Sequence, residues 1–251
     1  MGIIQMRFPT LACLLLLLSA KDGKGTLMNA TGFVAASRQD GRLSLNARSE
    51  VDSSLWLNSL IALLLIVLLS PLLAAIAVLI WKRDGAPIVF AHYRVGQHGK
   101  LFRCLKFRSM LRDSDRRLAE LLRNDPKACE EWQRDQKLSN DPRITPIGQF
   151  LRKTSLDELP QLFNVFRGEM SLVGPRPITV SELERYGVVR WHYLSVRPGM
   201  TGLWQISGRN NTSYKERIAL DHRYIEQRSL LGDLYILFKT VRVVLFREGA
   251  R

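Results

Sequence analysis

Cysteine is scarce in this sequence of 251 residues, and no two cysteines stand in a metal-binding spacing. Cys13, Cys104 and Cys129 are odd in number and far apart, with no CxxC motif among them. A disulfide framework needs paired cysteines, and a thiolate zinc site needs closely spaced ones. The composition therefore argues against a small disulfide-rich scaffold, and it suits a catalytic part that faces a reducing cytosol.

Charge is missing from one long segment. Residues 55–81, LWLNSLIALLLIVLLSPLLAAIAVLIW, contain no Lys, Arg, Asp, Glu or His. As a helix this segment would be about 40 Å long at about 1.5 Å per residue, which exceeds the roughly 30 Å of a bilayer's hydrocarbon core. The segment excludes an entirely soluble protein and predicts a membrane helix.

The topology of that helix stays open on the residues alone. Ser70-Pro71 lies near its middle, where proline removes one backbone hydrogen bond and favours a kink. Basic residues flank both ends, namely Arg42 and Arg48 before it and Lys82 and Arg83 after it. Because positive charge marks the cytoplasmic side, this symmetry gives no orientation. A straight spanning helix and a bent, re-entrant helix are both compatible with it.

The net charge of +14 lies mostly after the apolar segment. Residues 82–251 hold 31 of the 37 basic residues and 19 of the 23 acidic ones. Such a basic region favours an anionic partner, which can be nucleic acid, an anionic membrane surface or a phosphorylated substrate. Charge alone does not choose among these three.

The first 54 residues combine two compositions. Leu11–Leu18 is a short apolar run after Arg7 and resembles the core of a signal peptide, with Ser19-Ala20 as a weak cleavage position. We favour a variable extension instead, because export would separate the following domain from cytosolic substrates. Residues 21–54 are rich in Gly, Ser, Asn and mixed charge, which predicts a flexible arm. Residues 1–54 are therefore expected to form a flexible N-terminal extension.

After Trp81 the pattern predicts a soluble part of the α+β class that is mainly helical. Short β-like runs with Gly turns predict a hairpin within residues 83–110. Helical patterns cover 113–138 with a break at Asp125-Pro126, 155–167, 181–193, 214–228 and 230–247. The chain is thus expected to comprise the extension, the membrane helix of residues 55–81 and one cytosolic domain over residues 82–251.

The last predicted helix carries an apolar stripe. Its members fall at helical spacing and are Leu230, Leu234, Leu237, Phe238, Val241 and Leu245. Packing in the core is the expectation for such a stripe. A basic amphipathic helix at an anionic lipid surface is the alternative.

An acidic pair, Asp157-Glu158, lies at the predicted start of a helix. Ser155 and Glu158 have the spacing of a capping box, with Ser155 as the N-cap. Asp157 then lies in the first turn, where unpaired N–H groups favour an ionised carboxylate and attract phosphate. An ionised aspartate beside a phosphate is suited to form an acyl-phosphate, and Glu158 is suited to hold Mg²⁺. Capping and metal binding compete for the same Glu158 oxygens.

Basic residues recur in rigid turns rather than along helical faces. Lys106 and Arg108 follow a glycine turn, Arg176 stands between two prolines, and Arg209 follows Gly208. Arginine presents a planar fork that binds two phosphate oxygens at once. A single arginine is more often a solvated surface charge, but several in turns, together with an acidic pair, indicate a phosphate site.

Four strings give the chain a resemblance to a known family. They are KFRSM (106–110), DPRIT (141–145), LRKTSLDELPQLFNVFRGEMSLVGPRP (151–177) and RPGMTGLWQISGRN (197–210). In this order they resemble the bacterial sugar transferases, the monotopic phosphoglycosyl transferases that start glycan assembly on a polyprenyl phosphate. The wording is most similar to the short, ExoY-type members that initiate exopolysaccharides. Long uninterrupted strings such as these are far more specific than a short motif.

The resemblance implies a reaction. The family's aspartate, matched by Asp157, attacks the β-phosphate of a UDP-sugar, releases UMP and carries the sugar phosphate until polyprenyl (undecaprenyl) phosphate accepts it. Galactose and glucose are the sugars implied. Mg²⁺ is the implied cofactor, with Glu158 as its ligand. Basic residues that match the family's phosphate- and nucleotide-contacting positions or a nearby basic motif are Lys106, Arg108, Arg152, Arg176 and Arg209.

The resemblance also implies where the protein works. It implies a re-entrant membrane helix broken at a Ser-Pro pair, matched by Ser70-Pro71, with amphipathic interfacial helices and a catalytic domain on the cytoplasmic face of the bacterial inner membrane. UDP-sugar, polyprenyl phosphate and membrane lipid are the expected partners, and nucleic acid is not expected. The turn at residues 84–87, DGAP, departs from the commoner GGP wording, which affects a loop and not the mechanism.

A membrane-anchored basic protein that binds anionic lipid or nucleic acid is the hypothesis from another functional class. It explains the charge and the apolar segment. It does not explain why an acidic pair occurs in the same chain as several turns that carry arginine.

Overall fold

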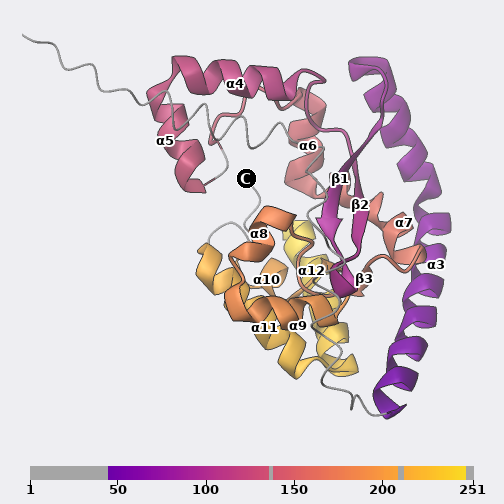
Figure 1. Ribbon diagram of the computed structural model, residues 1–251. Coiled ribbons are helices and arrows are strands. Elements are labelled where there is room, and N and C mark those ends of the chain that lie inside the picture. Colours follow the sequence, from indigo (N-terminus) through magenta and orange to yellow (C-terminus); the bar gives the residue numbers. More distant parts are fainter. Residues whose placement is uncertain (1–44, 136–137, 209–211, 247–251) are drawn as a thin grey trace, which may run out of the picture. The chain divides into compact units, whose positions relative to one another are not determined.

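The computed structural model describes residues 45–135, 138–208 and 212–246 (Figure 1). The described chain forms two compact units. One unit contains residues 110–145, and the other contains the rest of the described residues. The signal-like run and most of the predicted arm lie outside the described residues. The architecture is mostly helical with a short two-stranded hairpin, as predicted from the sequence.

The apolar segment lies within one long helix, α3 (Leu45–Asp84). Of the helices in the described ranges, its part Leu55–Asp84 is long and apolar enough to cross a membrane, with a mean hydropathy of 3.1. Only 11% of its most apolar window is buried, so this surface is not the core of a soluble domain. The helix begins inside the predicted flexible extension, because a formed helix extends at little cost once nucleated.

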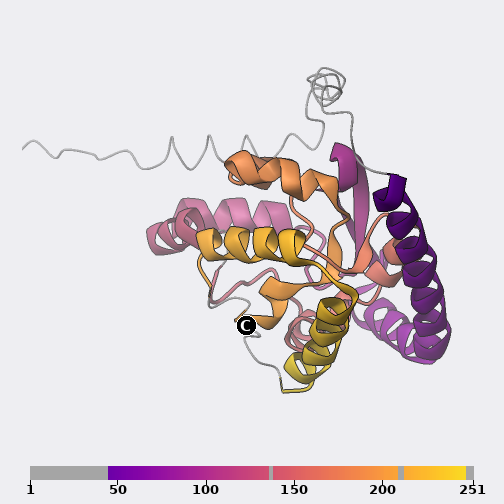
Figure 2. The ribbon, with the colours of Figure 1, turned by 90° about the horizontal axis from the view of Figure 1, so that it is seen from below.

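The predicted break at Ser70-Pro71 is not a break in the helix, because α3 continues through Pro71. Figures 1 and 2 show α3 as a curved rather than a straight helix. Pro71 has no N–H to donate to the carbonyl of Val67 one turn earlier. The hydroxyl of Ser70 donates to that carbonyl instead, at 2.8 Å. The pair therefore keeps the Val67 carbonyl satisfied, which matters where no water can reach it.

Two polar contacts attach α3 to the chain that follows. Asn58, in the apolar segment, accepts a hydrogen bond of 2.8 Å from the backbone N–H of Leu172. At the other end of α3, Nη2 of Arg108 donates to the carbonyl oxygens of Asp84 and Gly85, at 2.7 Å each. These carbonyls belong to the last residue of α3 and the residue after it, where the helix supplies no N–H donor. Arg108 thus completes the C-terminus of α3.

The predicted hairpin consists of β1 (Val89–Val95) and β2 (Leu101–Phe107), joined by the short 3-10 helix η2 (Gln97–Gly99). The strands are antiparallel with Phe90 opposite Lys106 and Arg94 opposite Phe102. Residues directly opposite each other in such a ladder share one face. Arg94, Cys104 and Lys106 therefore lie on the same face of the hairpin.

The outer edge of β2 is covered by α7 (Gln161–Phe166). Asn164 is fully buried; its Oδ1 accepts from the N–H of Leu105 at 3.0 Å, and its Nδ2 donates to the carbonyl of Arg103 at 2.8 Å. One amide side chain therefore pairs the two backbone groups that a third strand would otherwise pair. Nδ2 also donates to Glu169 at 2.7 Å, which fixes the amide. The helix α6 (Pro146–Thr154), which was not predicted, precedes this region.

A second, parallel strand pair was also not predicted. It consists of β3 (Ser171–Val173) and β4 (Gly199–Thr201). The backbones cross so closely there that a Cβ on Gly199 would lie 2.0 Å from the N atom of Gly174. A Cβ on Gly202 would lie 2.1 Å from the carbonyl oxygen of Gly174. Only glycine fits at these positions, and the crossing brings the chain around residue 176 next to the chain around residue 204.

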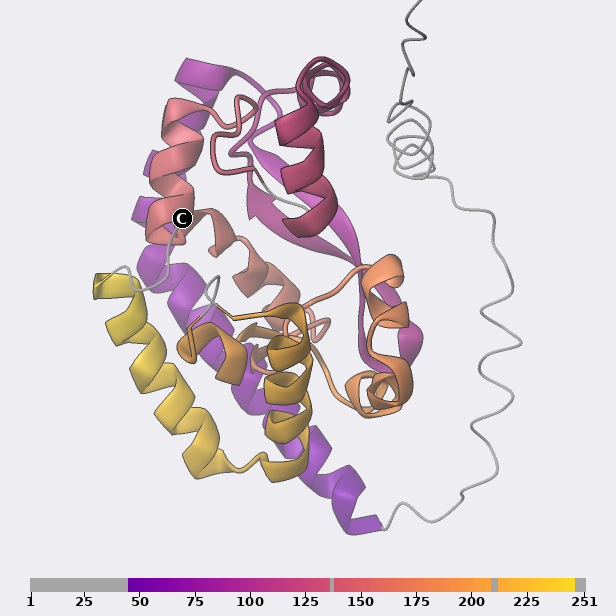
Figure 3. The same cartoon turned by 90° about the vertical axis from the view of Figure 1, so that its left-hand side faces the viewer.

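Helical elements complete this unit. They are α8 (Val180–Glu184), η4 (Gly187–Val189), α9 (Arg190–Ser195), α10 (Leu203–Ile206), α11 (Tyr214–Gln227) and α12 (Leu230–Phe246). Figure 3 shows α11 and α12 on either side of their short connection, and α10 contacts both of them. Capping boxes start two of the helices, with Thr179 before α8 and Ser213 before α11.

The prediction that the apolar stripe of α12 packs in the core is wrong for most of its members. Leu230, Leu234, Phe238 and Val241 are all more than half exposed, with Phe238 at 74%. The buried positions of α12 include Ile236 instead. Periodicity locates an apolar face but does not say whether protein or lipid covers it.

The smaller unit contains α4 (Ser114–Asn124) and α5 (Pro126–Asp135), which confirm the predicted helix interrupted at Asp125-Pro126. Its core packs Leu118, Leu122, Ala128 and Cys129. In the DPRIT string, Arg143 makes two hydrogen bonds to the carboxylate of Asp141, at 2.7 and 2.8 Å. This buried pair shapes the turn.

Candidate active site

The acidic pair lies in a tight turn rather than at the start of a long helix. Asp157 and Glu158 belong to the three-residue 3-10 helix η3 (Leu156–Glu158), and α7 begins only after Pro160. Ser155 has φ of 57° and makes no side-chain cap, so the predicted capping box is wrong. A capping residue needs an extended backbone, whereas Ser155 is left-handed. The Ser155 side chain therefore provides no cap for this turn.

Lys106 joins the hairpin to this turn. Its Nζ lies 2.6 Å from Oε1 of Glu158, and both side chains are about 30% exposed. The contact spans two segments that are far apart in the sequence, and it places a positive charge beside both acids. Lys106 and Glu158 thus form the charged centre of the site.

Burial sets the protonation of Asp157. The side chain is buried, and this desolvation raises the pKa of Asp157 to about 6. Lys106 opposes the rise, the negative charge of Glu158 adds to it, and Arg152 opposes it. With a pKa of about 6, roughly nine tenths of the carboxylate is ionised at pH 7. Asp157 is therefore a buried, poorly solvated anion at neutral pH.

A pocket opens beside Glu158. Its lining consists of Arg94, Cys104, Lys106, Glu158, Gln161, Arg176, Pro177, Met200 and Gln205. Three of these residues are basic and one is acidic, so the pocket favours an anion. Burial raises the pKa of the Cys104 thiol, which keeps it protonated and makes it a poor nucleophile at neutral pH. A carboxylate is the better nucleophile at this site.

Arg176 is held at the pocket through its backbone and its guanidinium group. The guanidinium carbon lies 5.1 Å from the centroid of the Trp204 ring, in reach of a cation–π interaction. The backbone N–H donates to the carboxylate of Asp221, and the carbonyl oxygen lies 3.3 Å from the hydroxyl of Tyr193. Asp221 and Tyr193 are both buried. They fix the turn that presents Arg176.

A charged network lies behind this turn. Glu182 accepts from Arg94 at 3.1 Å and lies 3.5 Å from Arg217. Arg217 is buried against the rings of Trp204 and Tyr214. Because Glu182 pairs with both arginines, it compensates positive charge close to the pocket.

The predicted site residues are placed as follows. Lys106, Glu158 and Arg176 meet at the pocket, and Asp157 adjoins Glu158 within the electrostatic reach of Lys106 and Arg152. Arg108 does not line the pocket, and its Nη2 is engaged by carbonyls at the end of α3. Its contact with substrate stays a prediction, as do the roles of the others. Arg209 lies outside the described residues.

Several residues at or near the pocket were not predicted from the sequence, among them Arg94, Trp204 and Gln205. Arg94 lies in a β-like run, and only the register of the hairpin shows that it shares a face with Lys106. Trp204 and Gln205 stand in the GLWQISGRN string, of which only Arg209 was predicted to bind substrate. The sequence could have predicted both residues, because an aromatic ring and an amide inside a glycine-rich turn are typical of ligand contacts.

The pocket contains oxygen donors that suit Mg²⁺. Glu158 supplies a carboxylate, and Oε1 of Gln205 is buried without a hydrogen-bond partner among the described residues. Carboxylate and amide oxygens are the ligands that Mg²⁺ prefers, and an orphaned buried oxygen is costly unless something binds it. The residues present therefore fit the ion.

Comparison with known proteins identifies the family. The model of the family described as bacterial sugar transferase matches residues 53–247. The chain belongs to the bacterial sugar transferase family. It is 51% identical over 191 residues to the exopolysaccharide production protein ExoY of Sinorhizobium fredii, a match that covers 76% of this chain and 84% of ExoY.

Other relatives in the family are much longer. The undecaprenyl-phosphate galactose phosphotransferase of Salmonella typhimurium is 55% identical over 192 residues, and the match covers 75% of this chain but 40% of the relative. The UDP-glucose:undecaprenyl-phosphate glucose-1-phosphate transferase of Klebsiella pneumoniae is 41% identical, with 72% and 38% covered. The chain thus spans about two fifths of the length of these relatives. The family resemblance of the motifs is confirmed, and the alternative of a basic binding protein has no support.

Proposed function

We propose that this protein transfers a hexose-1-phosphate from a UDP-sugar to undecaprenyl phosphate, releases UMP, and so begins the assembly of an exopolysaccharide. The observation that carries the proposal is the pairing of a buried, ionised Asp157 with Glu158 and Lys106 at the edge of a basic pocket. Membership in the sugar transferase family and the names of the relatives support this reaction class.

The first step uses Asp157 as the nucleophile. A carboxylate oxygen of Asp157 attacks the β-phosphorus of the UDP-sugar, the bond from that phosphorus to the bridging oxygen breaks, and UMP leaves with the electron pair. The product is a sugar phosphate esterified to Asp157. Burial favours this step, because a poorly solvated carboxylate has little hydration to lose before it attacks.

The second step regenerates the free carboxylate of Asp157. An oxygen of undecaprenyl phosphate attacks the same phosphorus, its bond to Asp157 breaks, and undecaprenyl diphosphosugar leaves. Asp157 is then ionised again, and no net proton transfer to it is needed. The arginine fork of Arg176 and the ammonium of Lys106 stabilise the phosphoryl oxygens, and the charge of Arg152 acts close to Asp157.

Mg²⁺ is part of the proposal. Glu158 and Gln205 would hold it, and the bound ion would neutralise diphosphate charge. In the structure, Nζ of Lys106 forms an ion pair with Oε1 of Glu158, at 2.6 Å. Lys106 therefore compensates the charge of Glu158 when the ion is not bound.

Galactose is the sugar we propose first. Relatives named for galactose, from Salmonella typhimurium and Erwinia amylovora, are 55% and 57% identical to this chain, whereas the relative named for glucose is 41% identical. A panel of UDP-sugars with undecaprenyl phosphate and product identification separates galactose from glucose.

The membrane arrangement is proposed from α3 and α12. We propose that α3 enters the cytoplasmic face of the bacterial inner membrane and returns to it, with Ser70-Pro71 as the point where it turns within the bilayer. The exposed apolar face of α12 then rests on the same surface. In this proposed arrangement the pocket lies near the lipid boundary, within reach of the undecaprenyl chain.

One experiment tests the mechanism directly. The purified protein, incubated with a UDP-sugar and without acceptor, should release about one UMP per active chain and gain the mass of a hexose phosphate on the peptide that contains Asp157. Asp157→Asn should show neither, while it stays in the membrane fraction. UMP release by that variant, or an unmodified peptide in the wild type during turnover, would contradict the proposal.

A further inference from the structure

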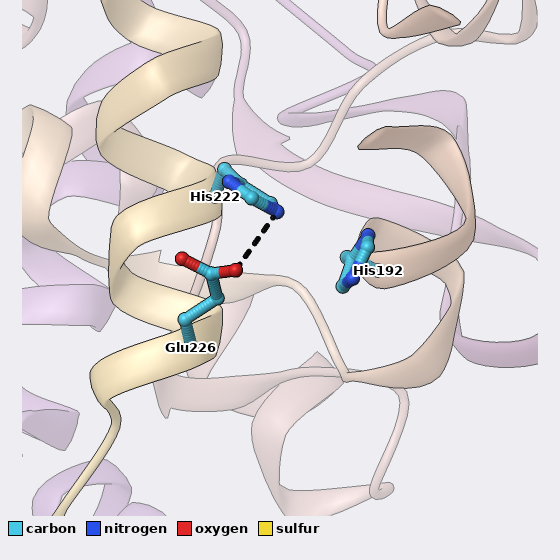
Figure 4. A group of neighbouring side chains, drawn as sticks. All are labelled: His192, His222 and Glu226. Atoms are coloured by element: carbon cyan, nitrogen blue, oxygen red, sulfur yellow. Dashed lines mark ion pairs between the residues drawn. The ribbon is translucent and has the colours of Figure 1, made fainter. Parts of the chain in front are cut away.

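A group of three metal-binding side chains lies outside the pocket. His192 belongs to α9, and His222 and Glu226 belong to α11 (Figure 4). One ligand atom from each residue lies within 4.8 Å of the other two. No residue of this group lines the pocket.

The helix brings two of the ligands together. His222 and Glu226 are four residues apart on α11, so they lie on one face of the helix. Nε2 of His222 lies 3.5 Å from Oε1 of Glu226. Zinc bonds of 2.0–2.1 Å in a tetrahedron place two ligand atoms about 3.3 Å apart. This pair already has that spacing.

His192 supplies a third ligand from the facing helix. Its ring and that of His222 meet edge to face, with centroids 4.7 Å apart and planes at 85°. The ligand atom of His192 has to close a gap of about 1.5 Å to reach tetrahedral spacing. His192 and Glu226 are exposed, so their side chains have room to rotate.

We propose that His192, His222 and Glu226 bind Zn²⁺ or a similar transition metal and thereby tie α9 to α11. Two imidazoles and one carboxylate form a donor set typical of zinc, with one position left for water. Mg²⁺ prefers oxygen ligands only, so it competes poorly for imidazole nitrogens. The site is therefore separate from the magnesium site proposed at Glu158, in residues and in chemistry.

The neighbours of the ligands give the site a consequence. Tyr193 follows His192, and Asp221 precedes His222; these two residues hold the backbone of Arg176. An ion that joins α9 to α11 therefore restrains both elements that fix the Arg176 turn. Because the metal binds the folded chain, it should also raise the melting temperature.

The test measures binding rather than catalysis. The full chain in detergent, freed of metal with a chelator and kept in millimolar Mg²⁺, is titrated with Zn²⁺, and bound zinc per chain and the melting temperature are measured. The wild type should bind one Zn²⁺ and melt several degrees higher with it. His192→Ala and His222→Ala should each weaken zinc binding by more than roughly 100-fold. Loss of a residue that only hydrogen-bonds a metal ligand weakens binding by roughly 10- to 100-fold.

Two further variants keep the test independent of misfolding. Glu226→His should tighten binding, because a third imidazole replaces the carboxylate, and a misfolded protein would not gain affinity. His92→Ala is the matched control, since His92 lies in β1 and in no such group among the described residues. Unchanged zinc binding in His192→Ala or His222→Ala, or no zinc bound by the wild type, would overturn the proposal. Either result leaves the transferase mechanism untouched.

Discussion

At the scale of single residues, Lys106 limits the rise that burial causes in the pKa of Asp157. Its charge opposes the effect of burial on the pKa of Asp157, which lies at about 6. Lys106→Met removes that opposition, so the pKa rises and the acidic limb of the pH–rate profile should move to higher pH by about one unit. The profile of product formation between pH 5 and 9 measures this. Lys100→Met, which removes an exposed lysine of the same hairpin, is the control. An unmoved limb would contradict the coupling.

The raised pKa of Asp157 also makes the stability of the folded protein depend on pH. The folded pKa of Asp157, about 6, exceeds its ordinary value of 3.8, so the folded state binds the proton more tightly. The associated stability is full below about pH 4 and is lost as the pH rises through about 6. Asp157→Asn escapes this loss and should be more stable than the wild type at pH 7, by about 1–3 kcal/mol.

Melting temperatures of the two proteins between pH 4 and 8 provide the measurement. The difference should appear as the pH rises from about 4 to 6 and stay constant above. A variant that is less stable at pH 7 than the wild type would show that burial of Asp157 is not the dominant effect.

Sequence alone pointed to the residues proposed to react, but not to the residues that surround them. Asp157, Glu158 and Arg176 stand in long, specific strings, so the sequence was enough to single them out as candidate site residues. Arg94 was not, because its role depends on which residue of β2 lies opposite it. The role of Ser155 was misread, since the capping spacing is compatible with a backbone that then turns left-handed.

At the scale of elements, Asn164 replaces a strand at the outer edge of β2. Asn164→Leu is close in volume but leaves the N–H of Leu105 and the carbonyl of Arg103 buried and unpaired. The expected cost is roughly 2–5 kcal/mol, or about 10 °C in melting temperature. Asn140→Leu, at an exposed position, should change stability by less than about 0.5 kcal/mol. Equal melting temperatures for the two variants would refute the edge-pairing role.

The exposed face of α12 is a second test at this scale. In lipid nanodiscs, a nitroxide on Phe238→Cys should be more accessible to oxygen than to a polar nickel chelate, because oxygen concentrates in hydrocarbon. A nitroxide on Arg223→Cys, which is exposed on α11, should show the reverse. Equal preference at the two positions would mean that water and not lipid covers Phe238.

Elements with strong local signals were predictable, and those made by distant pairing were not. Proline ended α4 at the expected place, and α11 and α12 followed their periodicity. The strands β3 and β4 have three residues each and pair across about 25 residues of chain, so no local pattern announces them. The stripe of α12 was located correctly but assigned to the wrong surroundings.

At the scale of the whole molecule, the topology of α3 decides how the protein sits in the membrane. If both ends of α3 are cytoplasmic, a cysteine at Glu50→Cys in a Cys13→Ser background should react with an impermeant maleimide only after the cells are opened. Arg83→Cys, at the other end of the apolar segment, is the matched control and should behave identically. Labelling of position 50 in intact cells would mean that α3 spans the membrane and that the re-entrant proposal is wrong.

The triple glycine crossing limits how this enzyme can change. Gly174 precedes the Arg176 turn, and Gly199 and Gly202 lie in a string that follows more than 20 residues later; not even a methyl group fits between them. A saturation library should therefore show no viable members at these three codons, whatever sugar is supplied. Efforts to alter donor preference have to leave this junction fixed and vary the nearby lining, with Met200 and Cys104 as the natural starting positions.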